Sequence, residues 1–471
     1  MNEHDSEVIA GMLQNLGCLP VEDKADADIV VINTCSIREN ADKRFFGTLG
    51  QLKKIKAVKP DFIACVCGCM MQQEHITTAI KQRYPWVDVI FGTHNIDEFP
   101  EMLQETLHIR DKNATFQPRT NVTENATFQP RTNVTYNLLK HEIRSSKESR
   151  VMRIYDDRPD IVEGLPSKRL YKHKAFMNIM YGCNNFCTYC IVPYTRGREK
   201  SRKPEDIIAE VKNLVADGVR EVTLLGQNVN SYKGGDWDFT DLIYALDKIE
   251  GLERIRFMTS HPKDLSDKLI KAFVECDSLC KYIHLPVQAG SSKVLKAMNR
   301  KYDREKYLDL IRKLREAVPH ITISTDIIVG FPGETEEDFE ETLTLAEQVG
   351  YDSAFTFLYS PRKGTPAAEM PDQIPEEVKH ERFNRLVDVI NASSQAKNDA
   401  YVGRTVKVLI EGSSKTDPTV LAGRTDGFKL VDIKVEAQNP EAAREKAQAA
   451  VGNIVDVTIT DAKTFSLKGR L

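Results

Sequence analysis

The sequence predicts an α/β protein in three parts: an N-terminal open α/β domain, a partial (β/α)6 barrel and a small antiparallel β-barrel. Apolar strand-like runs alternate with helical patterns over residues 1–110 and again over 171–400. Residues 401–471 instead contain short strands whose side chains alternate between two faces. The length agrees with this division, because 471 residues correspond to about three domains and 41% of them are hydrophobic.

Composition restricts the function and the compartment. The formal net charge is -4, so a nucleic-acid partner would have to meet a local basic patch rather than a global positive field. The N-terminus has no secretory signal pattern, and no apolar run reaches the length that spans a bilayer. We therefore expect a cytoplasmic monomer without a membrane partner. In a reducing compartment its 10 cysteines would serve metal binding or catalysis rather than structural disulfides.

The N-terminal domain, residues 1–110, has cysteines where strands end. Apolar runs at 28–35 and 62–69 each lead into a polar turn, and residues 87–91 form a third predicted strand. Ligands of open α/β sheets gather at the carboxyl ends of strands. Cys35 and Cys69 lie at such ends and could converge on one metal site, although free cysteines are often just small buried residues.

The linker, residues 111–170, contains an exact duplication. The segment 113–123 recurs at 125–135. Two identical Thr/Asn-rich copies cannot be two different core elements, so we expect an inserted, solvated surface loop. Its Asn-x-Thr triplets match glycosylation acceptors, but this is a weak signal without a secretory segment.

The central domain, residues 171–400, carries six strand-like runs separated mostly by helical patterns. The runs span residues 175–180, 221–225, 254–258, 282–285, 321–329 and 354–358. Repeated strand-helix units with right-handed connections curl into a partial barrel whose active site lies at the carboxyl ends of the strands. The segment from Cys183 to Cys190 follows the first strand, so we expect it at this end.

Three thiols in that segment, Cys183, Cys187 and Cys190, are spaced by three residues and then by two. Thiolates bind both zinc and iron-sulfur clusters. A closed zinc site needs a fourth ligand, and residues 191–210 contain neither His nor Cys. A four-iron cluster with three protein ligands leaves one iron open to a small molecule. We favour the cluster over zinc.

Cations follow the cysteine segment. Arg196, Arg198, Lys200 and Arg202 lie within seven residues, together with one acid. Near a catalytic end of a barrel such a patch could hold RNA phosphates. A solvated surface is the alternative. At the C-terminus, residues 401–471 predict an OB-like barrel, a fold that commonly binds looped or single-stranded RNA.

The spacing of the three cysteines resembles that of the radical S-adenosylmethionine (SAM) superfamily. The resemblance implies a 4Fe-4S cluster whose open iron chelates the methionine end of SAM. It also implies SAM contacts from Gly226 and Gln227, after the second strand, and from Tyr189 beside the adenine. A plain backbone turn and a packed aromatic ring are the alternatives for these residues.

The segments 33–40 and 67–70 resemble the N-terminal domain of the radical SAM methylthiotransferases. The resemblance implies a second 4Fe-4S cluster held by three cysteines, two of which match Cys35 and Cys69. The third belongs to a family segment that would precede Met1. Cys18, Cys65 and Cys67 do not occupy the family position, so the sequence leaves the third ligand unassigned and the second cluster in doubt.

Residues 401–471 resemble the tRNA-binding TRAM domain of the same family, and segments 2–7 and 182–199 are most similar to its branch acting on isopentenylated tRNA. The resemblance implies conversion of N6-isopentenyladenosine next to the anticodon to its 2-methylthio form, with a flavodoxin or ferredoxin as electron donor. One SAM would give a 5'-deoxyadenosyl radical and a second would supply the methyl group. The rival hypotheses are a sister enzyme acting on threonylcarbamoyladenosine, a methylthiotransferase acting on a ribosomal protein, and a non-catalytic RNA-binding protein with one cluster.

Overall fold

The computed structural model describes residues 1–35, 39–110, 133–137, 150–158, 160–414, 417, 419–435 and 440–471. It divides into two compact units. One comprises residues 1–170, 181–184 and 190–200, and the other comprises 171–180, 185–189 and 201–471. In the described part of the chain, no helix combines the length and apolarity needed to cross a bilayer.

The first unit is a six-stranded sheet between two helical layers. Its strands are ordered β1-β5-β2-β3-β4-β6. The elements are α1 (Asn2–Asn15), β1 (Leu19–Pro20), β2 (Ile29–Thr34), α2 (Glu39–Val58), β3 (Ile63–Gly68), η1 (Cys69–Gln72), α3 (Glu74–Arg83), β4 (Val89–Phe91), η2 (Ile96–Glu98), α4 (Phe99–Arg110), β5 (Asn133–Asn137) and β6 (Val151–Arg153). The three strands predicted within residues 1–110 are confirmed as β2, β3 and β4.

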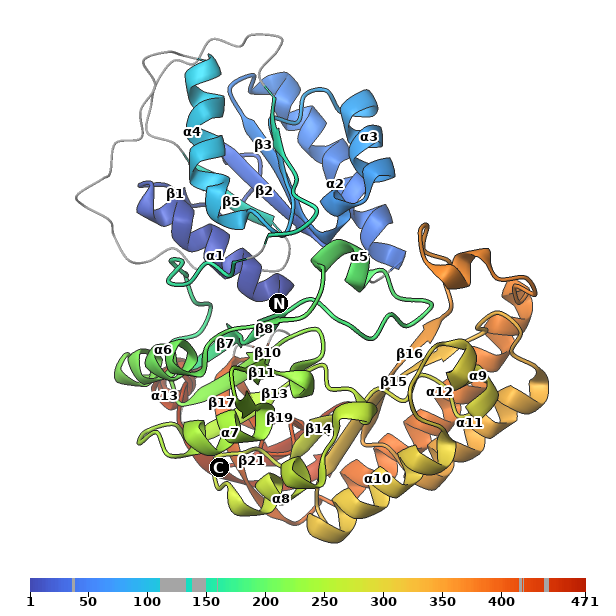
Figure 1. Cartoon of the computed structure of the whole chain (residues 1–471). Helices are drawn as coiled ribbons and strands as arrows, with labels where there is room; N and C mark the ends of the chain where they lie inside the picture. The colour runs from blue at the N-terminus through green and yellow to red at the C-terminus, as the bar shows by residue number, and fades with distance from the viewer. Residues whose placement is uncertain are drawn as a thin grey trace. The chain divides into compact units, whose positions relative to one another are not determined.

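Successive side chains of the buried strands point alternately to the two helical layers. Val31 of β2 and Cys65 of β3 pack in the core that holds α1 and α4, whereas Val30 and Ala64 pack in the core that holds α2 and α3. Figure 1 shows α4 and the pair α2 and α3 on opposite faces of the strands. Because successive strand side chains point to opposite faces, continuous apolar runs are what a doubly covered sheet requires.

The sheet extends beyond the boundary predicted at residue 110. β5 pairs antiparallel with β2, joining Val134 to Val31, and β6 pairs parallel with β4. β5 includes residues 133–135, the end of the second repeat copy, which we expected in a surface loop. Val, Thr and Tyr are residues that favour β-strands, and β5 lies between β1 and β2. The remainder of the duplicated segment lies outside the described residues.

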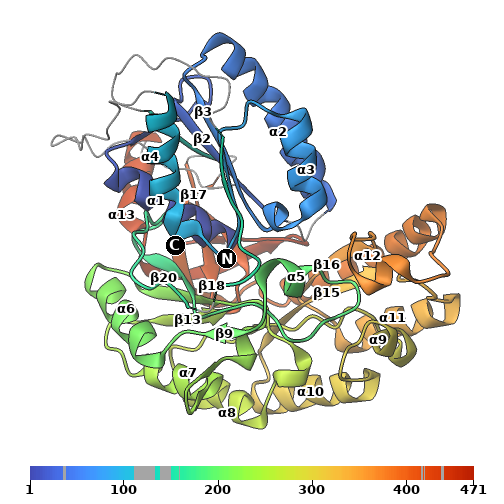
Figure 2. The same ribbon diagram turned by 45° about the horizontal axis from the view of Figure 1, so that its top comes forward.

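The second unit contains the barrel. Its six strands are those predicted, within three residues at each end: β7 (Lys174–Asn178), β10 (Glu221–Leu225), β13 (Arg254–Phe257), β14 (Tyr282–His284), β15 (Thr322–Val329) and β16 (Ser353–Leu358). They form two parallel three-stranded sheets, β13-β10-β7 and β14-β15-β16. The helices are α6 (Pro204–Ala216), α7 (Phe239–Asp247), α8 (Asp267–Glu275), α9 (Ser292–Ala297), α10 (Arg304–Ala317), α11 (Glu336–Val349) and α12 (Glu376–Asp399). Figure 2 shows α6, α7, α8 and α10 on the outer side of the strands.

Shorter elements complete this part of the chain. They are β8 (Met180–Tyr181), α5 (Val192–Arg196), β9 (Lys200–Ser201), η3 (Val229–Ser231), β11 (Lys233–Gly234), β12 (Trp237–Asp238), η4 (Pro262–Asp264) and η5 (Pro366–Glu369).

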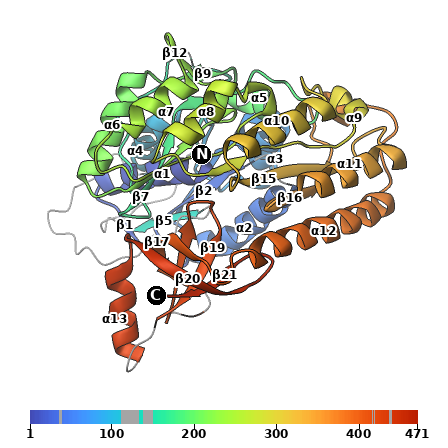
Figure 3. The ribbon, with the colours of Figure 1, turned by 90° about the horizontal axis from the view of Figure 1, so that it is seen from below.

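The C-terminal region is a closed barrel in the order β17-β18-β19-β21-β20. Its elements are β17 (Thr405–Ser413), β18 (Val420–Thr425), β19 (Leu430–Lys434), α13 (Pro440–Ala450), β20 (Ile454–Ala462) and β21 (Leu467–Arg470), seen together in Figure 3. This confirms the predicted fold class, with one difference. β19 and β21 pair parallel, whereas every other neighbouring pair is antiparallel.

The turn between β18 and β19 docks against the amino ends of the barrel strands. Arg256 of β13 donates from Nη2 to the Thr425 carbonyl and from Nη1 to the Asp426 carbonyl, both at 2.7 Å. Phe428 packs on Tyr282 with ring centroids 4.9 Å apart. The C-terminal barrel is therefore fixed to the end of the strands opposite their carboxyl ends.

Candidate cluster sites

The cysteine segment leaves the carboxyl end of the first barrel strand, as predicted. Gly182 has a φ of 73°, and a Cβ there would lie 2.0 Å from the Arg198 carbonyl oxygen, so glycine is required. The backbone N–H of Cys183 donates to the Gly197 carbonyl at 3.1 Å. Two backbone contacts thus hold the start of the segment against residues 197–198.

The middle of the segment is held by residues 297–299, at the carboxyl end of α9. Thr188 donates from its backbone N–H to the Met298 carbonyl at 3.1 Å and from its hydroxyl to the Ala297 carbonyl at 3.0 Å. Asn299 donates from Nδ2 to the Phe186 carbonyl at 2.9 Å. Phe186 and Asn299 both have positive φ, 48° and 59°, a conformation that non-glycine residues seldom adopt. The surrounding bonds hold this conformation around Cys187.

Cys187 is buried, and its sulfur has a cationic neighbour. Arg300 Nη1 lies 3.4 Å from Cys187 Sγ, and the arginine is itself buried. A guanidinium beside a buried sulfur suits a sulfur that carries negative charge, as the ligand of a metal cluster does. Arg300 could not be recognised from the sequence, because a single arginine after a helix has no pattern that marks it as buried.

The three predicted ligands are divided between the units. Cys183 and Cys190 belong to the first and Cys187 to the second. Within the described residues, no group of three or more His, Cys, Asp or Glu side chains is already gathered for a metal ion. Assignment of the three thiolates to one cluster therefore rests on their spacing and family.

The residues expected to contact SAM lie near the same segment. Tyr189 is half-buried against the barrel core. Gly226 follows β10, and a Cβ there would lie 2.6 Å from Met180 Cγ, so a glycine is needed for packing. Gln227 is half-buried beside it. Their contact with SAM stays a prediction.

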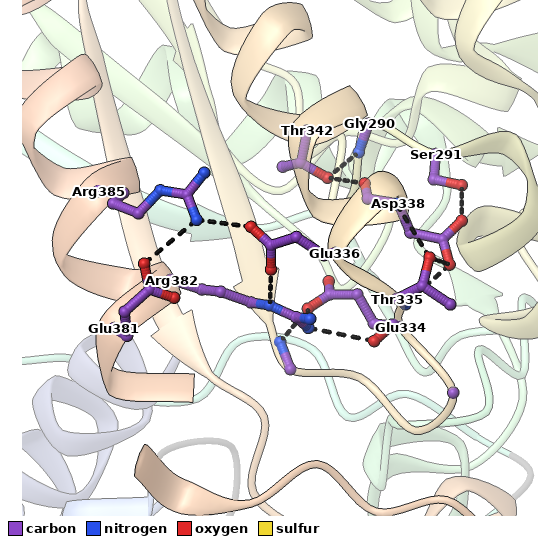
Figure 4. A network of polar contacts seen from close by, with 12 residues as sticks. Gly290, Ser291, Glu334, Thr335, Glu336, Asp338, Thr342, Glu381, Arg382 and Arg385 are labelled. Atoms are coloured by element: carbon purple, nitrogen blue, oxygen red, sulfur yellow. Dashed lines mark hydrogen bonds and ion pairs between the residues drawn. The ribbon is translucent and has the colours of Figure 1, made fainter. Parts of the chain in front are cut away.

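The loop after β15 is fixed by a polar network (Figure 4). Gly330 donates its N–H to Glu334 Oε2 at 2.8 Å, and Arg382 of α12 binds the same oxygen at 3.0 Å. Burial raises the pKa of Glu334 to about 7. Thr335 and Asp338 form a capping box at the start of α11. These bonds hold the loop at the carboxyl end of β15 rigidly against α11 and α12.

An aromatic and polar surface lines the strands beside this loop. His284 Nδ1 is 2.9 Å from the Ser324 hydroxyl, and His284 Nε2 is 3.5 Å from Asp326 Oδ1. Phe355 of β16 packs its ring edge-on to His284 at 6.0 Å and remains 50% exposed. An exposed aromatic ring beside hydrogen-bonding groups can accept a flat heterocyclic base.

The second pair of thiols lies at adjacent strand ends in the first unit. The parallel register pairs Thr34 with Gly68, which are the last residues of β2 and β3. Cys35 and Cys69 directly follow these two strand ends. Cys69 is buried and Cys35 half-buried. Burial raises the pKa of the Cys69 thiol, and the nearby Arg196 guanidinium opposes that rise. Two sulfurs at one sheet edge, one facing a cation, suit cluster ligation.

Arg196 makes that cationic contact. Its Nε lies 3.1 Å from Cys69 Sγ, and its Nη2 lies 2.8 Å from Asp5 Oδ2. We expected Arg196 to contact RNA phosphates. The structure instead buries it, with its guanidinium directed at Cys69 and Asp5. Its place in α5, whose residues pack near η1, could not be read from the local run of charges.

The other expected RNA contacts differ in exposure. Arg202 is buried, donating to the Asn178 carbonyl at 2.8 Å and to Glu210 at 2.6 Å, so it also departs from our expectation. Lys200 is half-buried and paired with Asp157. Arg198 is exposed. Contact of Arg198 and Lys200 with RNA stays a prediction.

Comparisons with known proteins match three segments of the chain. Residues 1–92 match the uncharacterized protein family UPF0004, residues 177–346 the radical SAM superfamily and residues 399–471 the TRAM domain. These matches define a radical SAM enzyme with an N-terminal UPF0004 region and a C-terminal TRAM domain. Membership in the superfamily implies a 4Fe-4S cluster and SAM, and the buried Cys187 sulfur beside Arg300 fits such a cluster.

Full-length relatives narrow the family. The tRNA-2-methylthio-N(6)-dimethylallyladenosine synthase of Clostridium tetani is 51% identical, covering 100% of this chain and 93% of the relative. The protein of the same name from Clostridium perfringens is 50% identical, covering 100% and 95%. The chain belongs to this family of synthases, which confirms the resemblance to radical SAM methylthiotransferases. Among solved structures, the cobalamin-dependent SAM radical enzyme OxsB matches 82% of this chain and 50% of its own at 13% identity, with a TM-score of 0.42, from which nothing about function follows.

Proposed function

We propose that this protein is a tRNA methylthiotransferase that converts N6-isopentenyladenosine next to the anticodon to 2-methylthio-N6-isopentenyladenosine. The observation that carries the proposal is the identity of 51% over the whole chain with a relative named for this reaction. Cys183, Cys187 and Cys190 would hold the SAM cluster, and Cys35 and Cys69 would contribute to a second cluster. The first cluster, when bound, supplies the electron that cleaves SAM.

The chain's own residues would position the reactants. Thr188 and Asn299 fix the backbone around Cys187, which keeps that thiol at the carboxyl end of the barrel. Tyr189, Gly226 and Gln227 would line the SAM site. Phe355, exposed beside His284, offers a surface on which the target base can stack.

RNA would be held by the C-terminal barrel and by cations that follow the cysteine segment. Unpaired loop bases are the part of a tRNA that a protein can reach and splay out. The TRAM barrel and the accessible cations Arg198 and Lys200 would contact the backbone of such a loop. A flavodoxin or ferredoxin would deliver electrons, and we propose a cytoplasmic monomer.

The direct test uses anaerobically reconstituted full-length protein, SAM, a reductant and tRNA bearing N6-isopentenyladenosine. We expect 2-methylthio-N6-isopentenyladenosine in the nuclease digest, measured by mass spectrometry, and about eight irons per chain if both clusters form. A parallel reaction with threonylcarbamoyladenosine tRNA separates the sister activity. Product from that tRNA alone, or no modified product with about four irons bound, would contradict the proposal.

A further inference from the structure

Arg300 is a buried cation whose partners are neutral apart from one sulfur. Its Nε donates to the Tyr302 hydroxyl and its Nη2 to the Pro286 carbonyl, both at 2.9 Å, while Nη1 points to Cys187 Sγ. Its side chain also packs over the Tyr302 ring, 5.1 Å from the centroid. Among the described residues, none of its hydrogen-bond partners is a carboxylate.

Burying a guanidinium without a counter-charge destabilises the fold, because removing a charge from water costs free energy that only an opposite charge in good geometry offsets. Among the hydrogen-bond partners of Arg300, the Cys187 sulfur is the one that most readily carries a negative charge. The missing negative charge is therefore expected at the sulfur, as a thiolate bound to iron would provide.

We propose that Arg300 is a positioning residue that donates a hydrogen bond to the Cys187 ligand and eases reduction of the SAM cluster. The inference rests on the proposed function, because it requires a four-iron cluster at Cys183, Cys187 and Cys190. Hydrogen bonds to cluster sulfurs and nearby positive charge stabilise the reduced cluster, which carries one more negative charge. Reduction of this cluster is the step that precedes SAM cleavage.

The contact between Arg300 and Cys187 could instead serve only to hold the cysteine segment in place, since Arg300 also binds the Pro286 carbonyl. The two roles differ in what they change. A brace affects how much cluster assembles and how stable it is, whereas a donor to the ligand changes the equilibrium between oxidised and reduced cluster. A redox titration therefore separates them, and activity alone would not.

The experiment titrates the full-length protein in a Cys35→Ala/Cys69→Ala background, so that the second cluster does not contribute. Iron, sulfide and the reduced-cluster electron paramagnetic resonance signal are measured for the parent protein and for Arg300→Met and Arg300→Lys. Arg304→Met is the matched control, because Arg304 lies four residues away and binds the Gly290 carbonyl rather than a cysteine.

We expect Arg300→Met to disfavour reduction about tenfold, which is 59 mV for a one-electron couple. Arg300→Lys keeps the charge but loses the planar fork, so a smaller shift in the same direction is expected. Arg304→Met should titrate like the parent. Equal midpoints for parent and Arg300→Met at equal iron content would overturn the inference.

Two further outcomes are informative. Arg300→Met could fail to assemble a cluster. In that case the reduction midpoints of the parent protein, Arg300→Lys and Tyr302→Phe are compared, and equal midpoints among these three overturn the inference. If the parent protein binds no four-iron cluster at all, the proposed function fails together with the inference about Arg300. A normal cluster that is insensitive to Arg300 overturns the redox role alone.

Discussion

The two units each place a buried arginine against a cysteine sulfur, but they treat its charge differently. In the first unit Arg196 contacts Cys69 and also pairs with the Asp5 carboxylate. In the second unit Arg300 contacts Cys187, and its other hydrogen-bond partners within the described part of the chain are neutral groups. We therefore expect replacement of Arg196 to change mainly the stability of the first unit, and replacement of Arg300 to change mainly the proposed SAM cluster.

The largest expected effect separates the two sites through the cysteines themselves. Cys187→Ala should abolish 5'-deoxyadenosine formation from SAM, because it removes a ligand of the cluster that cleaves SAM. Cys69→Ala should retain SAM cleavage and lose methylthiolation of tRNA. Both products are measured by mass spectrometry in the same reaction. If Cys187→Ala still forms 5'-deoxyadenosine, its assignment as a ligand is wrong.

The next-largest effect is expected from replacing Arg196, whose charge is paired with that of Asp5. Arg196→Met leaves the half-buried Asp5 carboxylate without its cation, so we expect the first unit to lose about 1.5–3 kcal/mol of unfolding free energy. The double variant Arg196→Met/Asp5→Asn should recover part of this loss. Urea unfolding followed by Trp86 fluorescence in a Trp237→Phe background reports on that unit, since the chain has 2 tryptophans. A stable Arg196→Met single variant would contradict the role of the ion pair.

A smaller effect should appear with pH. Burial alone would raise the pKa of Asp5, but the Arg196 guanidinium holds that pKa below the usual value of 3.8. A depressed carboxyl pKa stabilises the fold above pH 3.8 and loses that contribution as the pH falls through the folded value. Asp5→Asn should therefore show a flatter dependence of unfolding free energy on pH in this acidic range. Parallel curves for the two proteins would show that Asp5 is not coupled to folding.

The smallest effect is expected from Tyr302→Phe, which removes one hydroxyl partner from Arg300 and keeps the cation near Cys187. We expect the midpoint of the SAM cluster to move less than in Arg300→Met. The redox titration described above measures it. A shift larger than that of Arg300→Met would mean that Tyr302, rather than Arg300, controls the cluster.

Most of the fold could be predicted from apolar periodicity and the first site from cysteine spacing. Strands such as β2 and β4 are largely apolar runs, and Cys183, Cys187 and Cys190 lie within one short segment, so local sequence carries both signals. Long-range partners have no such signal. Arg196 stands in a run of cations typical of a surface, yet Asp5, 191 residues earlier in the chain, buries it. β5 is separated from β2 by a repeat, so its pairing was equally hidden.

The turn between β18 and β19 has a consequence for the size of the substrate. It closes the amino end of the barrel, whereas the segment around Cys187 stands at the other end of the strands. At about 3.3 Å per residue, a strand such as β15, with 8 residues, measures about 26 Å. We therefore expect that an RNA contacting both the C-terminal barrel and the proposed cluster site would have to extend along the barrel strands, which a free nucleoside cannot do.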